Sequence, residues 1–352
     1  RSVAVGYQTL AFQNFTTAVN SFNTAVGHLA GNKVTTGIRN TLIGASAGDA
    51  LTDADFNVAV GKDALGRDTL GSKTVAIGEG ALAFQNFTTA TDTHNTAVGY
   101  DAGGDLTTGA ENTFVGALAG DATDDGASNT SVGYASLRAN AGNDNTAVGA
   151  NALASCTGAN NTAVGYAAGL AIGSGGNNLV LGKDAGRTGS PGGNITTASN
   201  TIVLGDEDCT AGNHIQTDWT VASDQRDKTD FTDLDLGLDF VKALAPVTYK
   251  WDKRSKYGDK YADDYDLNEQ TPDGTHKEDW LDIGFKAQAV QALEEAAGYT
   301  TAAKKNLTVS TSEDGKQMGL QYSKFIPILV KAIQEQNALI EALTARITTL
   351  EG

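Results

Sequence analysis

Short apolar triplets recur along the first two hundred residues, and a glycine follows each of them. In the triplet at residues 24–26 the first residue is Thr, the middle residue is Ala and the last is Val, and the other triplets vary this theme. The intervals between the glycines run from 16 to 23 residues, and 17 is the commonest. A period near 17 is too short for a pair of helices and predicts one coil of a β-solenoid or β-roll per repeat. These anchoring glycines are Gly6, Gly27, Gly44, Gly61, Gly78, Gly99, Gly116, Gly133, Gly149, Gly165, Gly182 and Gly205.

Each triplet is expected to form a short strand, in which successive side chains point to opposite faces. We expect the first and third residues, such as Thr24 and Val26, to point into the coil. The small middle residue, such as Ala25, would then face outward and let another surface approach closely. Coils of this size bury little surface alone, so the alanine face predicts lateral association, most naturally of three chains around an axis.

Asparagine precedes the triplet in nine of the twelve repeats, and stacking the coils would align these side chains into a hydrogen-bonded ladder. Repeats such as NTAVG at 23–27 resemble the head repeats of trimeric autotransporter adhesins and similar repeats in phage tail fibres. The resemblance implies a trimeric shaft or head.

A second period is superimposed on the first, because the segment AFQNFTT occurs twice at a shift of 72 residues. It places phenylalanines in loops, and tyrosines directly follow several anchoring glycines. Exposed aromatic rings could stack on sugars, and the alternative is that they pack on their own coil or on a neighbouring chain. The candidate glycan contacts are Phe12, Phe15, Phe84, Phe87, Tyr100, Tyr134 and Tyr166, and Tyr7 shares the same ambiguity.

The pattern changes after Gly205, where charge becomes dense and helical periodicity appears from Leu236, from Ile283 and in the last segment. The segment PVTYKWD from Pro246 is typical of a strand. We therefore predict an all-β trimeric β-solenoid or β-roll shaft at 1–205, a junction at 206–222, and an α+β domain at 223–352 that ends in a long coiled-coil helix at 325–352.

The last segment carries apolar residues at alternating intervals of three and four, sustained for over three heptads. Such a repeat predicts a coiled-coil seam between chains. The alternative is one amphipathic helix packed on its own domain. The seam residues are Ile326, Leu329, Ile333, Gln336, Ile340, Leu343, Ile347 and Leu350.

Composition removes several classes of function. A net charge of −17 argues against a nucleic-acid partner, which would require clustered Lys and Arg. No apolar run reaches the roughly 18 residues that a bilayer span requires, so we expect no membrane insertion. Cys156 and Cys209 lack metal-ligand spacing and are expected to be small core residues. We predict neither a metal nor a cofactor.

Four segments of the second half resemble the C-terminal intramolecular chaperone domains of phage endosialidases, tail spikes and tail fibres. They are SDQRDK from Ser223, GLDFVKALAPVTYKW from Gly237, IGFKAQAVQAL from Ile283 and YSKFIPILVKAIQEQ from Tyr322. One departure is Ala289, where an acidic residue often follows the glutamine. The resemblance implies a domain that trimerises, guides the folding of an upstream shaft and releases itself by cutting before its own first serine.

Carried over to this sequence, the resemblance makes Ser223 the nucleophile, Lys228 the base and Ala222–Ser223 the scissile bond. A serine and a lysine five positions apart carry little weight alone. A lysine in water has a pKa near 10.4, so one that takes a proton from serine near pH 7 must lie where burial or positive charge lowers that value. Arg226 could supply such charge, whereas Asp224 opposes it. We expect the site to become competent only when a trimer closes over it.

These observations predict part of a trimeric phage tail fibre or related adhesin, in the virion, that contacts a host surface glycan or receptor. The chaperone domain would act as a single-turnover self-cleaving serine peptidase and leave during assembly in the host cytoplasm. Two alternatives stay open. The terminal domain could be a permanent trimerisation cap, or the chain could be the distal part of a glycan-degrading tailspike whose catalytic domain precedes Arg1.

Overall fold

The chain divides into two compact units, Arg1–Asp208 and Cys209–Gly352. The computed structural model describes residues 1–206, 208–209, 223–260, 262, 264–300 and 305–352. Each unit is described by itself, beginning with the repeat unit.

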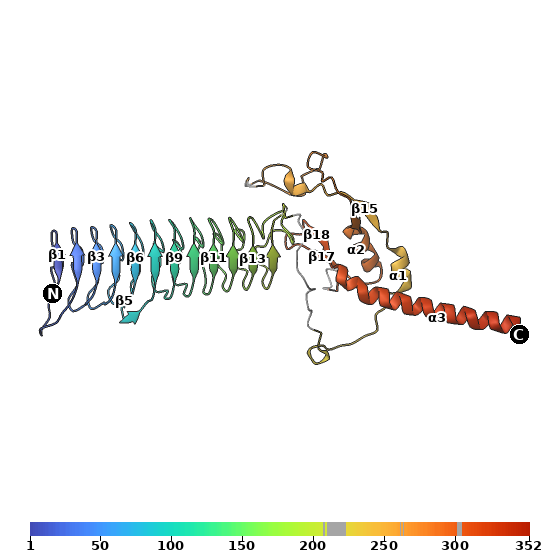
Figure 1. Ribbon diagram of the computed structural model, residues 1–352, viewed down its shortest axis with the longest axis horizontal. Coiled ribbons are helices and arrows are strands. Elements are labelled where there is room, and N and C mark those ends of the chain that lie inside the picture. The colour runs from blue at the N-terminus through green and yellow to red at the C-terminus, as the bar shows by residue number, and fades with distance from the viewer. Residues whose placement is uncertain (207, 210–222, 261, 263, 301–304) are drawn as a thin grey trace. The chain divides into compact units, whose positions relative to one another are not determined.

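The repeat unit is a β-solenoid in which each repeat contributes one strand to a twelve-stranded parallel sheet (Figure 1). The pairing is in register, so that the first residue of each triplet lies beside the first residue of the next, as Thr130 lies beside Thr146. A separate pair, β5 (Gly71–Ser72) and β7 (Thr91–Asp92), lies outside this sheet. The strands of the main sheet are β1 (Val3–Val5), β2 (Thr24–Val26), β3 (Thr41–Ile43), β4 (Val58–Val60), β6 (Val75–Ile77), β8 (Thr96–Val98), β9 (Thr113–Val115), β10 (Thr130–Val132), β11 (Thr146–Val148), β12 (Thr162–Val164), β13 (Leu179–Leu181) and β14 (Ile202–Leu204).

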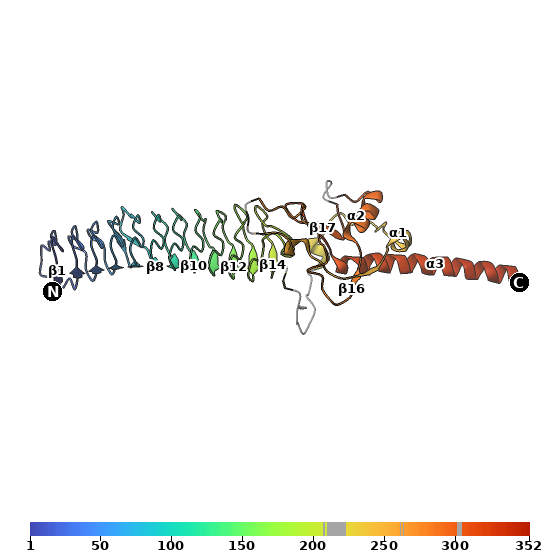
Figure 2. The same ribbon diagram turned by 90° about the horizontal axis from the view of Figure 1, so that it is seen from above.

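The prediction of which side chains point into the coil was wrong. From β2 onward the middle residue of every strand in the main sheet is buried, and Ala25, Ala59 and Ala163 are fully inaccessible. The first and third residues face outward, and Val132 and Val164 are exposed. The middle residue points inward whatever its size, since Leu42 and Phe114 are as fully buried as the alanines, and the alternation of the strand sends the first and third residues outward. Figure 2 shows the strands gathered along one side of the unit and the rest of each coil on the other.

The asparagine ladder is confirmed. The side-chain oxygen of Asn95 accepts a hydrogen bond from the main-chain N–H of Asn112 at 2.8 Å, and Asn112 does the same for Asn129 at 2.9 Å. The side-chain nitrogen of Asn112 donates to the carbonyl oxygen of Gly126 at 2.9 Å. Asn112 therefore satisfies two main-chain groups of the next coil, one N–H and one carbonyl.

The anchoring glycines are required by both conformation and space. Gly116 has a φ of +134°, a value that residues with a Cβ atom rarely adopt. A Cβ atom there would lie 2.5 Å from the carbonyl oxygen of Gly133. The coils therefore approach each other closely at this column.

The second unit is an α+β domain with a small core. Its core residues are Leu236, Phe240, Val290, Val309, Phe325 and Ile328. Two antiparallel strand pairs join β15 (Val247–Tyr249) to β16 (Asp282–Gly284) and β17 (Val309–Thr311) to β18 (Met318–Leu320). The helices are α1 (Leu238–Ala243), α2 (Ala287–Ala296) and α3 (Phe325–Glu351), with short 3-10 turns at η1 (Gln225–Asp227), η2 (Arg254–Lys256) and η3 (Tyr322–Lys324).

Two buried or half-buried carboxylates fasten the helices of this domain. Glu294 on α2 accepts hydrogen bonds from the N–H groups of Leu307 at 3.1 Å and Thr308 at 2.7 Å. Glu335 on α3 accepts from the N–H of Leu238 at 2.7 Å, at the N-terminus of α1, where a negative charge is favoured. These contacts tie α2 to the segment before β17 and α3 to α1.

The glycine column generates a prediction about the solenoid. Gly116→Ala combines a disfavoured backbone conformation with contact against the next coil, so we expect it to destabilise the repeat unit by about 2 kcal/mol or more. Gly104→Ala is the matched control, because Gly104 has no such φ and its Cβ would meet the Asp101 carbonyl oxygen at an ordinary 3.4 Å. Equal thermal unfolding of the two variants would contradict the role of the column.

Candidate functional site

The residues around Ser223 form one tight turn. Asp224 caps η1 by accepting a hydrogen bond from the N–H of Arg226 at 2.9 Å, and the N–H of Lys228 donates back to the carbonyl oxygen of Gln225 at 3.2 Å. This single 3-10 turn reverses the chain and brings the side chain of Lys228 beside Ser223.

The structure places the two residues expected to carry the chemistry in contact. Lys228 Nζ donates to Ser223 Oγ at 2.6 Å and lies 3.4 Å from the carbonyl oxygen of Ser223. This is the separation expected of a nucleophile and its base. For the lysine to act as a base the polarity of the bond must reverse, with a neutral amine accepting the hydroxyl proton. The distance suits proton transfer in either direction.

Arg226 binds Asp224. Its guanidinium donates to both carboxylate oxygens, through Nε at 3.1 and 3.2 Å and through Nη2 at 2.6 Å. These hydrogen bonds hold the pKa of Asp224 below its ordinary value and raise the pKa of Arg226. The pair is close to neutral as a unit, so Arg226 leaves little positive field for Lys228.

Ser223, Asp224, Arg226 and Lys228 are all exposed in the single chain. A lysine in water is protonated near pH 7, and removing water from around it favours the neutral amine. In one chain, therefore, Ser223 and Lys228 are in hydrogen-bond contact but both remain exposed to water. Ala222, the other side of the expected scissile bond, lies outside the described residues.

A known family of domains matches the segment that begins with these residues. Residues 223–299 match the chaperone-of-endosialidase family. The family is of a self-cleaving serine-peptidase type, and the match to this chain begins at Ser223. A chaperone domain preceded by a β-solenoid supports a phage tail fibre-like protein. No curated protein and no solved structure matches this chain.

The expected seam lies on helix α3 of the chaperone unit. The eight seam residues are exposed without exception, from Leu329 at 43% to Leu350 at 79% among the apolar ones. The residues that face the domain core are different ones, Phe325, Ile328 and Ala332. The helix therefore packs on its own domain through a different face, near its start, and its heptad face stays uncovered. An amphipathic helix that only packed on its own domain would bury its apolar face instead.

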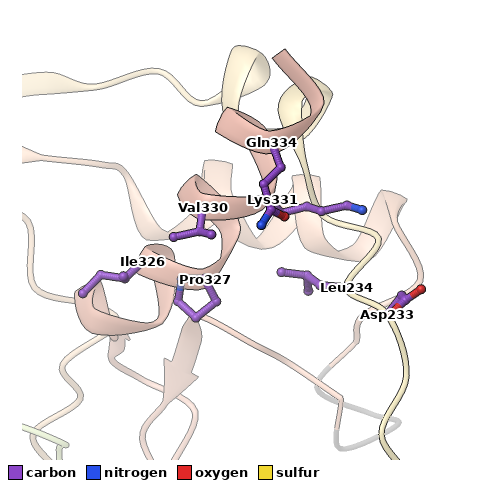
Figure 3. Close-up of a pocket in the computed structure, with 7 residues that line it drawn as sticks. All are labelled: Asp233, Leu234, Ile326, Pro327, Val330, Lys331 and Gln334. Atoms are coloured by element: carbon purple, nitrogen blue, oxygen red, sulfur yellow. The ribbon is translucent and has the colours of Figure 1, made fainter. Parts of the chain in front are cut away.

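A groove begins where the seam begins. It has a volume of about 510 Å³ and lies between the segment at Asp233 and Leu234 and the first turns of α3 (Figure 3). Ile326 and Val330 line it and are exposed, and Ile326 is also the first seam residue. The uncovered apolar surface of α3 thus continues into the groove.

The candidate glycan contacts differ in accessibility. Phe87 is buried in its own coil, and the Arg67 guanidinium lies 3.9 Å from the ring centre of Phe84. Phe12 is exposed and Phe15 is half-buried. The three tyrosines Tyr100, Tyr134 and Tyr166 are exposed, and each lies in the turn that directly follows a strand of the main sheet.

Part of the second repeat of AFQNFTT is anchored rather than loop-like. Gln85 is buried, donates to the Asp68 carboxylate at 2.6 Å and accepts from the side chain of Asn95 at 2.8 Å. Asp68 also accepts from the N–H of Phe87 at 3.0 Å. This buried network joins the insertion to the asparagine ladder at the coil where Thr74 replaces the usual asparagine.

Other expectations on ligands and membranes concern the described residues alone. Within them, no three or more His, Cys, Asp or Glu side chains are placed to hold a metal ion. None of the helices among them is long and apolar enough to cross a bilayer. Cys156 is buried as expected, but Cys209 is exposed, so its assignment as a core residue was wrong.

Sequence reasoning missed Glu294 and Glu335. A glutamate inside a helical pattern is ordinarily assigned to the solvated face, and no local signal marks these two as acceptors for distant N–H groups. The residue spacing also gave no sign that Arg226 would bind Asp224.

The two faces of α3 generate a prediction. Ile333→Asp combined with Ile340→Asp changes only exposed seam positions, so we expect the domain to stay folded and helical while self-association is lost. Ile328→Asp, a change at a buried core position, should instead unfold the domain. Circular dichroism and sedimentation velocity on the three proteins make the comparison. Unchanged self-association of the double variant would contradict the prediction that these residues form a seam between chains.

Proposed function

We propose that this chain is part of a trimeric phage tail fibre whose terminal domain assembles the β-solenoid and then separates from it by cutting the 222–223 peptide bond. The observation that carries the proposal is the contact between Lys228 and Ser223 at the first residue of the matched domain. It brings the proposed nucleophile and the proposed base together within the second unit, Cys209–Gly352, where the family match begins.

The chemistry needs no other group from the chain. Lys228 takes the hydroxyl proton while Ser223 Oγ attacks the carbonyl carbon of residue 222, and the carbon–nitrogen bond breaks as a carbon–oxygen bond forms. The proton passes to the departing nitrogen, which becomes the free α-amine of Ser223. Water then hydrolyses the ester, leaving a carboxylate on residue 222 and a restored serine hydroxyl. Each chain reacts once, because the reaction destroys its own substrate.

Assembly is the proposed switch. The dyad is exposed in one chain, so activation requires a covering surface. The uncovered heptad face of α3 offers the means to bring two further chains to the domain. Trimerisation would exclude water from Ser223 and Lys228 and thereby couple cleavage to completed assembly.

Cleavage also has a physical use for the shaft. Three chains must be aligned before any contact between their coils can form, and a template at one end lowers the entropic penalty of that alignment. Once the template has left, the reverse route is closed and the fibre becomes kinetically stable. We further propose that the fibre belongs to the virion, that it contacts a host surface glycan or receptor, and that the chaperone domain is released in the host cytoplasm.

A retained trimerisation cap is the competing function, because an exposed heptad face serves it equally well. The two differ in one measurable property, the covalent continuity of the chain at 222–223.

The denatured mass of freshly expressed protein tests this proposal. We expect two fragments that meet between residues 222 and 223, and at least a roughly 100-fold slower appearance of both fragments in Ser223→Ala and Lys228→Ala, the loss typical of removing a nucleophile or base. Lys242→Ala is the control, since Lys242 is an exposed lysine that pairs with Asp239. Intact chains in every sample would establish the permanent cap.

The coupling to assembly is tested separately. The Ile333→Asp and Ile340→Asp double variant should remain uncleaved, because its chaperone domain stays monomeric and the dyad stays in water. Efficient cleavage by a protein shown to be monomeric would contradict the proposed switch while leaving the Ser–Lys chemistry intact.

A further inference from the structure

The outward face of the twelve-stranded sheet is the most uniform apolar surface of the described chain. Its two central columns are the first and third residues of the strands, and all of them are Thr, Val, Ile or Leu. Every one of them is exposed or half-exposed. A face twelve strands long without a charge is unusual in a chain of net charge −17, and contiguous apolar surface of this kind marks an interface.

We infer that this face is the surface on which three copies of the chain pack, with each coil at the same height as its counterparts. The inference rests on the proposed trimeric function and adds which surface of the shaft joins the chains. It replaces the expected alanine face, because the alanines are buried inside the coil.

The size of the face suits such an interface. Strands lie about 4.8 Å apart and rise about 3.3 Å per residue, so the face measures roughly 53 by 20 Å, on the order of 1,000 Å². A stable protein interface buries about 800 Å² per partner. Divided between two neighbours, the face supplies about 500 Å² to each, so each pair of chains buries about 1,000 Å² in total, the lower end of the range for a specific interface.

Two further columns flank the face and identify the partner. One column lies five positions before each anchoring glycine and is here called the leading column; the other directly follows the glycine and is called the trailing column. From β2 onward the leading residues share a left-handed backbone, with φ between 52° and 63°, so they form one continuous row. Rotation about an axis parallel to the stack keeps each coil at its height and sets the leading column of one chain against the trailing column of the next.

The leading residue of one chain and the trailing residue of the same coil in the next chain carry compatible charges. At the coil of β6 the leading residue is Lys73 and the trailing residue is Glu79, which form an opposite pair across the boundary between chains. At the coil of β4 the trailing Lys62 would meet the leading Phe56, a cation against an exposed ring. From β2 to β13 no coil sets two like charges against each other. Lys73 and Glu79 also have exposed partners in their own chain, Asp92 and Lys62, and such surface pairs are weak and readily exchanged.

The sizes of the side chains are complementary at several coils. At two of them the leading residue is charged, Glu111 or Asp144, and the trailing residue is alanine, Ala117 or Ala150.

The opposite arrangement occurs at two further coils, where the trailing residues are the exposed rings Tyr134 and Tyr166 and the leading residues are the small Ser128 and Asn160. Two other coils set ring against ring, Phe22 with His28 and His94 with Tyr100. Complementary sizes within one sequence favour packing of the two columns against each other, and therefore a second copy of the chain as the partner.

Paired cysteines test the interface and its register. Ser128→Cys with Tyr134→Cys places both thiols at one coil, in a full-length chain that also carries Cys209→Ser to remove the exposed native thiol. Within one chain the two positions are about 20 Å apart, at about 3.3 Å per residue, whereas a disulfide needs Cα atoms within about 7 Å. Oxidation should therefore link chains and produce covalent trimers on non-reducing electrophoresis.

The control shifts one thiol by two coils. Ser128→Cys with Tyr166→Cys offsets the thiols by roughly 10 Å along the stack, so we expect at least about tenfold less covalent trimer. Sedimentation of the unoxidised proteins supplies the independent measurement. Trimers that fail to crosslink, or that crosslink equally in both variants, would overturn this interface and leave the trimeric fibre standing. Chains that sediment as monomers would overturn the trimeric function and this interface with it.

Discussion

The structure of the shaft depends on the hydrogen bonding of each coil to the next. Since the main-chain groups of one strand are paired only when another strand lies beside it in register, every repeat must present the same groups at the same height. This constraint places a glycine at each close approach, as Gly116 shows against Gly133. It also places an asparagine oxygen under each following N–H, as at Asn95 and Asn112. Equivalent residues therefore become continuous columns, and a column can carry a property that no single coil could provide.

The same constraint leaves the shaft with a folding problem. The main-chain groups of a coil form hydrogen bonds with the coils above and below it. Its outward β-branched face remains uncovered in a single chain. Three such faces can meet only after three chains are aligned, and alignment of long chains is entropically unfavourable and slow. The chaperone unit presents an uncovered heptad face on α3, which is suited to aligning chains before the coils stack. In the proposed trimer, the heptad face of α3 and the uncovered sheet face would therefore act together, the first to align the chains and the second to hold them.

Much of this could be predicted from the sequence, because periodicity reports directly on stacking. The repeat of about 17 residues, the asparagine ladder, the strand at β15 and the helix α3 follow from patterns that local geometry imposes. The facing of the triplets could not be predicted from hydrophobicity alone. Val132 is more apolar than Ala147, and the usual rule sends the larger apolar residue inside. The main chain instead points the middle residue of every triplet inward, whether it is Ala147 or the much larger Phe114. The contact of Ser223 with Lys228 was expected from the resemblance, whereas the binding of Arg226 to Asp224 depends on rotamers that spacing does not determine.

Self-cleavage imposes a further condition on the interface. If the 222–223 bond is cut, the heptad seam leaves with the domain that carries it, and the fibre must then be held together by residues before Ser223. Sidewise contact between coils is the remaining means, and a charge-free face some twelve strands long is able to supply it. A permanent cap would place no such demand, since α3 would hold the chains throughout. A charge-free sheet face that can join chains is therefore what a released fibre would need, and it would link the proposed cleavage before Ser223 to residues far along the shaft.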